Sequence, residues 1–364
     1  LTIQKRENDL VAASFGRGFF VLDDYSALRE FTLGNLNKEG KLFQPRPAKW
    51  FVQRSNVGNT GADYYFAKNP EYGAVFTYHL SKEYKMKKSL RQKREKELNK
   101  AEKNVPFPGW EALDAEKQEM PAQVILTIED QQGNVINKVK KKASKGSHRI
   151  AWNLEHFNPF AISMNGRSRR GGGALATPGT YQATLHLEKD GNVTKLDGPI
   201  SFEVKPIREG VLKGAGYAEY NAFRTDLTSF IQQISKVQDK FDQSKKKLKA
   251  LSTAVDRSKL SPGSLEPKIA DLKVAIASVD FMLEGSPSKE EIGERNPSGV
   301  QRYFYNAFDG MGHSYGPTAL HKKSLEIAKS MLVKVETEVD KIVNSMIPKI
   351  EEALKVADAP YISN

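Results

Sequence analysis

Three stretches of the chain carry apolar residues at alternating spacings of three and four, the period that places side chains on one face of an α-helix. The first stretch is interrupted once, near Ser244, and Pro348 is expected to kink the end of the third. With a short helix near residues 301–308, these stretches predict an antiparallel long-helix bundle over residues 209–364. The stretches are residues 220–255, 265–283 and 325–346.

Residues 73–208 alternate between apolar and polar positions with the period of two that is typical of half-buried strands. In residues 73–80, for example, Ala74, Phe76 and Tyr78 share one face. Short strands separated by Gly and Asn turns predict an immunoglobulin- or fibronectin-like β-sandwich, with a charged helical insertion at residues 82–121. The expected strands are residues 73–80, 122–130, 134–139, 147–154, 178–188 and 199–205.

The N-terminal residues 9–22 read as a β-hairpin with a tight turn at Gly16, Arg17 and Gly18. A lone hairpin is not stable in water, so we expect residues 1–33 to be the last strands of a sheet completed elsewhere, joined by a connector at residues 34–72. The adjacent acids Asp23 and Asp24 point to opposite faces of an extended strand, which favours a turn-capping role over a catalytic dyad. The prediction for the whole chain is a multi-domain α+β protein.

The composition of the chain excludes several classes of chemical site. The 364 residues contain no Cys, which excludes disulfides, thiolate metal sites and cysteine nucleophiles, and the formal net charge is +12. Much of the basic excess lies in residues 82–103, where interleaved Glu indicates a solvated helix. No recognised binding module with base-stacking aromatics accompanies the charge, which argues against nucleic-acid binding. No stretch is apolar enough for a transmembrane segment or a signal peptide. Because the chain begins at Leu1 inside an expected strand, we expect its natural start, with any export signal, to lie upstream.

Motifs for catalysis or metal binding are not recognisable. The six His residues have no spacing that places two ligands on one helix face, so no metal site and no cofactor is predicted. The glycine-rich residues 165–179 lack the Lys-Ser/Thr of a P-loop and read as a flexible basic loop. Its arginines, Arg167, Arg169 and Arg170, can engage an anionic partner.

Several segments, in order, resemble the C-terminal part of bacterial sortilin-like, BNR-repeat β-propeller proteins, which often carry the label glycosyl hydrolase. These segments include SFGRGFFVLDDYSALREF, PAQVILTIEDQQGNVINKV, TPGTYQATLHL and GPTALHKKSLEIAKSMLVKVETEVDKIVNSMIPKIEEAL. The resemblance implies an exported protein in which Gly16, Arg17, Gly18, Asp23 and Asp24 belong to a propeller-closing motif. The Asp-box of sialidases, Ser-x-Asp-x-Gly-x-Thr-Trp, is absent from these residues.

Three functions remain open from the sequence. The first is a non-catalytic module that braces a propeller and offers a surface to an envelope protein or an acidic glycan. The second is part of a secreted glycan or peptide hydrolase whose active site lies in the upstream propeller. The third is a sortilin-type peptide receptor. The expected location for all three is the periplasm, the outer-membrane surface or the extracellular space.

Overall fold

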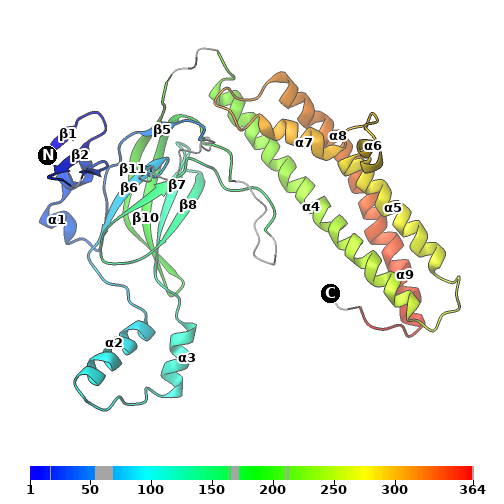
Figure 1. Cartoon of the computed structure of the whole chain (residues 1–364), viewed down its shortest axis with the longest axis horizontal. Helices are drawn as coiled ribbons and strands as arrows, with labels where there is room; N and C mark the ends of the chain where they lie inside the picture. Colours follow the sequence, from blue (N-terminus) through cyan, green and yellow to red (C-terminus); the bar gives the residue numbers. More distant parts are fainter. Residues whose placement is uncertain are drawn as a thin grey trace. The chain divides into compact units, whose positions relative to one another are not determined.

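The computed structural model describes residues 1–16, 18–53, 69–162, 164, 172–208, 210 and 213–362 of this mixed α+β protein. The chain divides into two compact units (Figure 1). The first contains all of the named strands, and the second contains the long helices. Among the described residues, no helix is both long and apolar enough to cross a membrane. The first unit comprises Leu1–Phe157 and Leu175–Glu209, and the second Asn158–Ala174 and Gly210–Asn364.

The chain opens with a small antiparallel sheet, which we call the N-terminal sheet. It consists of β1 (Thr2–Gln4), β2 (Asp9–Ser14) and β3 (Gly18–Leu22), in the order β1-β2-β3. The β2–β3 hairpin predicted from the sequence is therefore present, with Val11 opposite Val21. A short 3₁₀ helix, η1 (Ser26–Glu30), and the single-turn α1 (Leu33–Leu36) follow it.

Two further sheets form the body of the first unit (Figure 1). The strand orders are β4-β6-β9 and β5-β11-β10-β7-β8, and all of these pairs are antiparallel except the parallel pair of β5 and β11. The strands are β4 (Gly40–Leu42), β5 (Ala48–Trp50), β6 (Ala74–Leu80), β7 (Gln123–Glu129), β8 (Val135–Lys142), β9 (Gly146–Trp152), β10 (Gly179–Lys189) and β11 (Asn192–Pro206).

One hydrophobic core joins these two sheets. The predicted apolar stripe of β6 is fully buried, and its Phe76 ring meets Phe202 of β11 edge-on at a centroid distance of 5.0 Å. Trp152 of β9 meets Tyr181 of β10 at 5.3 Å in the same way. These aromatic contacts cross from one sheet to the other, so the two sheets face each other across the core.

Within residues 34–72, expected to form a connector, the structure contains the strands β4 and β5. Leu42 and Phe43 are completely buried, and Trp50 is nearly so. Each strand is three residues long, too short to show a period of two in the sequence. Burial against the facing sheets, rather than local pattern, defines them.

A helical arm, α2 (Lys87–Lys100) and α3 (Trp110–Gln118), is inserted between β6 and β7. Its two helices are held together by Arg91, which donates to both carboxylate oxygens of Glu116 at 2.7 and 2.9 Å. Arg91 also donates to Glu95, one turn along α2, at 2.6 Å. A paired, bidentate geometry of this kind compensates the burial of the Glu116 carboxylate.

The second unit is built on α4, whose 40 residues give a length of about 60 Å. The apolar stripe of α4 is interrupted at Ser244, but the helix continues through this position. Ser244 is buried there, and its hydroxyl is satisfied because it donates to the Lys240 carbonyl oxygen at 2.9 Å. Helix α8 passes through a π-helical segment (Ile342–Met346) into α9 just before Pro348, where the proline removes a backbone donor. The helices are α4 (Tyr217–Asp256), α5 (Glu266–Glu284), α6 (Pro287–Glu291), α7 (Val300–Asp309), α8 (Ala319–Lys341) and α9 (Ile347–Val356).

Candidate functional site

The most exposed apolar element of the first unit is β3. Its residues Phe19, Phe20, Val21 and Leu22 are 79%, 61%, 55% and 43% exposed. Successive residues of a strand point to opposite faces, so Phe19 and Val21 lie on one face and Phe20 and Leu22 on the other. Both faces of β3 are therefore apolar and open, and among the described residues β3 pairs only with β2. A run of this kind is typical of strands covered on both sides.

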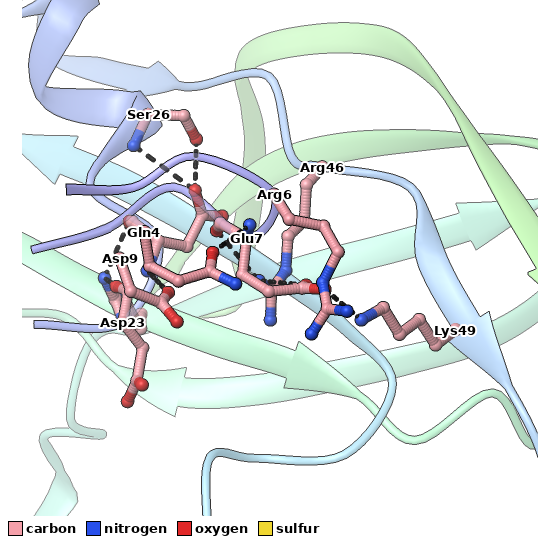
Figure 2. Close-up of polar contacts among 10 residues, drawn as sticks. Gln4, Arg6, Glu7, Asp9, Asp23, Ser26, Arg46 and Lys49 are labelled. Atoms are coloured by element: carbon pink, nitrogen blue, oxygen red, sulfur yellow. Dashed lines mark hydrogen bonds and ion pairs between the residues drawn. The ribbon is translucent and has the colours of Figure 1, made fainter. Parts of the chain in front are cut away.

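The N-terminal sheet is fixed to the rest of the unit by two polar connections, which we call the anchor. The first centres on Glu7, in the turn between β1 and β2 (Figure 2). Arg46 Nη1 donates to Glu7 Oε2 at 3.1 Å and to the Glu7 carbonyl oxygen at 3.0 Å, and Lys49 of β5 donates to Oε1. The Glu7 N–H donates in turn to Gln4 Oε1 at 2.6 Å.

The second connection joins the end of β3 to β9. Arg149 Nη2 donates to the carbonyl oxygen of Asp23, and to that of Asp24 at 2.9 Å. The Asp24 N–H donates to Asp9 Oδ1 at 2.9 Å, and Asp24 Oδ1 accepts from the Ser26 N–H at 3.2 Å. Asp24 adopts a positive φ of 43°, a conformation that Asp tolerates better than most residues. The turn after β3 is thereby held from both sides.

The charges around Glu7 set its protonation. The hydrogen bond from Lys49 and the positive charges of Lys49, Arg46 and Arg6 lower the pKa of Glu7, although partial burial opposes the shift. Glu7 is therefore ionised at neutral pH and holds two cations of the neighbouring segment. A carboxylate committed in this way serves as a structural anchor.

Hydrogen bonds occupy three carboxylates of this region. The carboxylates of Glu7, Asp9 and Asp24 each accept hydrogen bonds from this segment of the chain, so none of the three stands unpartnered as a general base or nucleophile. Among the described residues, no group of three or more His, Asp or Glu is placed to hold a metal ion. The N-terminal sheet therefore offers an exposed apolar surface that the anchor holds to the rest of the unit.

The helical arm presents a second exposed apolar group. Phe107 and Trp110 lie in and just after the loop between α2 and α3, with their rings edge-on at a centroid distance of 5.0 Å. Both side chains are exposed, although aromatic residues of this size usually find burial in a protein or at an interface. The arm is thus a further candidate contact surface.

The structure places some of the site residues expected from the sequence, and others lie outside the described residues. Gly16 and Gly18 flank the hairpin turn with φ of 72° and 94°, angles at which a side chain is strained. Asp23 and Asp24 lie in the anchor, Asp23 through its main-chain carbonyl. Arg17, Arg167, Arg169 and Arg170 lie outside the described residues.

The sequence interpretation missed the anchor residues Glu7, Arg46 and Arg149. Arg46 lies 39 residues from Glu7, and Arg149 lies 126 residues from Asp23, so no local motif joins them. Only the folded arrangement brings these residues together. Comparison with known proteins adds no constraint, since no family model and no curated protein matches the chain.

Proposed function

We propose that the chain is a non-catalytic module of an exported protein, which braces a β-propeller through the N-terminal sheet and offers surfaces for protein or envelope contacts. The observation that carries this proposal is the exposure of the four apolar residues of β3 on both faces of the strand. Each blade of a propeller is a small antiparallel sheet that packs between two neighbouring blades. A propeller blade therefore requires apolar side chains on both faces, as β3 has.

The order β1-β2-β3 supports the same interpretation. Propeller blades are four-stranded antiparallel sheets, and the N-terminal sheet supplies three strands in sequential order, with one edge of β3 left unpaired by the described residues. A fourth strand and the neighbouring blades would cover the surface that is exposed here. Their source in this proposal is the remainder of the same propeller, as the family resemblance implies.

The crossings between the two facing sheets support the proposal of an immunoglobulin-like sandwich. The chain passes from β6 in one sheet to β7 and β8 in the other, returns to β9, and crosses again to β10 and β11, as in a Greek key. In addition, the Tyr181 hydroxyl near the start of β10 donates to the Thr177 carbonyl at 2.6 Å. A tyrosine bonded to the backbone just upstream resembles the tyrosine corner of such sandwiches, which supports the same proposal.

The mechanism of bracing follows from the anchor. Glu7 is tied to the segment of β5, and the turn after β3 is tied to β9, so both facing sheets hold the N-terminal sheet. A load on the propeller would pass through these bonds into the sandwich core. Because Lys49 is about half exposed, its ion pair with Glu7 contributes about 1 kcal/mol or less.

Hydrogen exchange tests the proposal. The backbone amides of β3 should exchange at least about 100-fold more slowly in the natural protein that includes a propeller than in the 364-residue chain, because the open edge becomes paired. The double substitution Phe19→Ser and Phe20→Ser should destabilise the natural protein but leave the 364-residue chain unchanged. Equal exchange in both proteins would rule out the bracing role, and hydrolysis of glycans or peptides by the 364-residue chain alone would rule out its non-catalytic character.

A further inference from the structure

Helix α5 is apolar on two faces. Its inner face fills the core of the second unit with Leu272, Ile276, Val279 and Leu283. Its outer face carries a second apolar row at alternating spacings of four and three, namely Ala270, Val274, Ala277 and Phe281. Val274 and Phe281 are 70% and 50% exposed, whereas a helix that is apolar all round is normally buried.

The outer face of α5 forms one wall of a preformed groove of about 640 Å³. The other wall is the segment from Ser286 to Pro297. Asn296 locks that segment to the end of α5, since its side chain accepts from the Ser286 N–H at 2.8 Å and donates to the Ser286 carbonyl at 3.0 Å. Gly299 permits a close return, because a Cβ there would lie 2.2 Å from the Leu283 carbonyl oxygen.

The spacing of the outer row is that of a coiled-coil seam, in which each apolar side chain inserts between side chains of a facing helix. We infer that this face of α5 is an interface between two copies of the chain, paired antiparallel about a two-fold axis at Ala277 and Ser278. In that register Val274 of each copy faces Phe281 of the other. Small residues meet at the axis, so the two helices can approach closely.

The flanking charges fit the same register. Lys273 and Glu284 lie along the same flank of the outer face, and neither makes an ion pair with a described residue. Antiparallel pairing about Ala277 and Ser278 places Lys273 of one copy beside Glu284 of the other, twice over. In a parallel pairing this flank of the two copies would lie on opposite sides of the seam, so Lys273 and Glu284 would not meet across it. Charge complementarity of this kind selects orientation and register more than it adds affinity.

The size of the interface limits its strength. The 19 residues of α5 span about 28 Å, and a single helix pair buries less than the roughly 800 Å² per partner of a standard interface. The dimer is therefore expected to be weak, with a dissociation constant in the micromolar range or above.

Sedimentation over a concentration series measures this association. The 364-residue chain should dimerise reversibly, and Phe281→Glu should raise the dissociation constant at least about tenfold because it places a charge in the seam. Val333→Glu is the matched control, since Val333 is a 64% exposed valine on α8 and should leave association unchanged. A chain that stays monomeric up to several hundred micromolar, or a dimer indifferent to Phe281→Glu, would overturn the inference.

Orientation has its own test, because the chain has no Cys. Under mild oxidation, Ala277→Cys should form a disulfide-linked dimer at the axis, whereas Ala270→Cys and Val333→Cys should not. Lys273→Glu should weaken association several-fold, and adding Glu284→Lys should restore it by exchanging the charges. Equal cross-linking at positions 270 and 277, or no rescue by the double exchange, would exclude the antiparallel arrangement.

Discussion

Strands β3 and β7 have the same kind of sequence and opposite surroundings. Both are short runs of consecutive apolar and β-branched residues, the composition of a strand covered on both faces. In β7, an interior strand of its five-stranded sheet, every residue from Val124 to Ile128 is buried. In β3 every residue is exposed.

The difference shows that strand formation and burial are separate requirements. Pairing with β2 satisfies the backbone of β3 along one edge and gives it the conformation of a strand. Burial of its side chains needs layers above and below, which no described residue of this unit supplies. Helix α5 shows the same separation, because its backbone is fully helical while the apolar row on its outer face is still exposed.

The largest effect on the free energy of unfolding is expected when a leucine is replaced by alanine, in each of the two strands separately. Leu126→Ala in β7 removes side-chain volume from a fully buried position and should lower the free energy of unfolding by about 3 kcal/mol or more. Leu22→Ala in β3 removes the same atoms from an exposed position and should change it by less than about 0.5 kcal/mol. Urea unfolding of the 364-residue chain checks both, and equal losses would show that β3 is covered in this chain.

A smaller effect is expected at the anchor, which holds the exposed sheet to the buried ones. Glu7→Gln removes a charged acceptor from Arg46 and Lys49 and should cost about 1 kcal/mol at neutral pH. Because the pKa of Glu7 is lowered in the folded chain, its stabilisation is fully present above the ordinary Glu value of about 4.3 and is lost as the pH falls through the lowered value.

The stability difference between Glu7→Gln and the unchanged chain should therefore shrink as the pH falls below about 4. Urea unfolding between pH 3 and 7 measures it. Glu71→Gln serves as the control, since Glu71 is an exposed glutamate of the same unit. A pH-independent difference would mean that the Glu7 charge contributes nothing to the anchor.

An effect of similar size but opposite sign is expected inside the core, at Tyr78 of β6. Its hydroxyl is buried with no hydrogen-bond partner among the described residues, and this burial raises the pKa of Tyr78 to about 12. Tyr78→Phe should raise the free energy of unfolding by about 1 kcal/mol, because it removes an unsatisfied polar group without changing the packing. Tyr181→Phe, which loses the bond to Thr177, should lower it by a similar amount.

The alkaline pH range tests the same hydroxyl. Between about pH 10 and 12 the Tyr78 hydroxyl ionises in the unfolded chain but stays neutral in the folded chain. The free energy of unfolding therefore falls as the pH rises through this range, relative to its value below pH 10. The advantage of Tyr78→Phe should therefore grow above pH 10, as followed by urea unfolding. A loss of stability in Tyr78→Phe at neutral pH would show that the hydroxyl is bonded in solution.

Periodicity in the sequence predicted the elements whose own residues supply a repeated signal. The alternation of β6 and the three-four spacing of α4 and α5 are long enough to be recognised, and the structure has these elements. The strands β4 and β5 were not predicted, because three residues are too few to show a repeated pattern. The outer row of α5 was not predicted because the inner row alone accounts for the three-four spacing, and the sequence does not show that a second row stays uncovered.

The sequence by itself determined most of the longer strands and helices and which face of most of them is apolar, since these properties depend on neighbours a few residues apart. Only the tertiary structure decided that Glu7 meets Arg46, that Arg149 holds the turn after β3, and that β3 and the outer face of α5 are left uncovered. The physical reason is distance along the chain. Contacts between residues tens of positions apart arise when sheets pack into a core, and no local pattern encodes them.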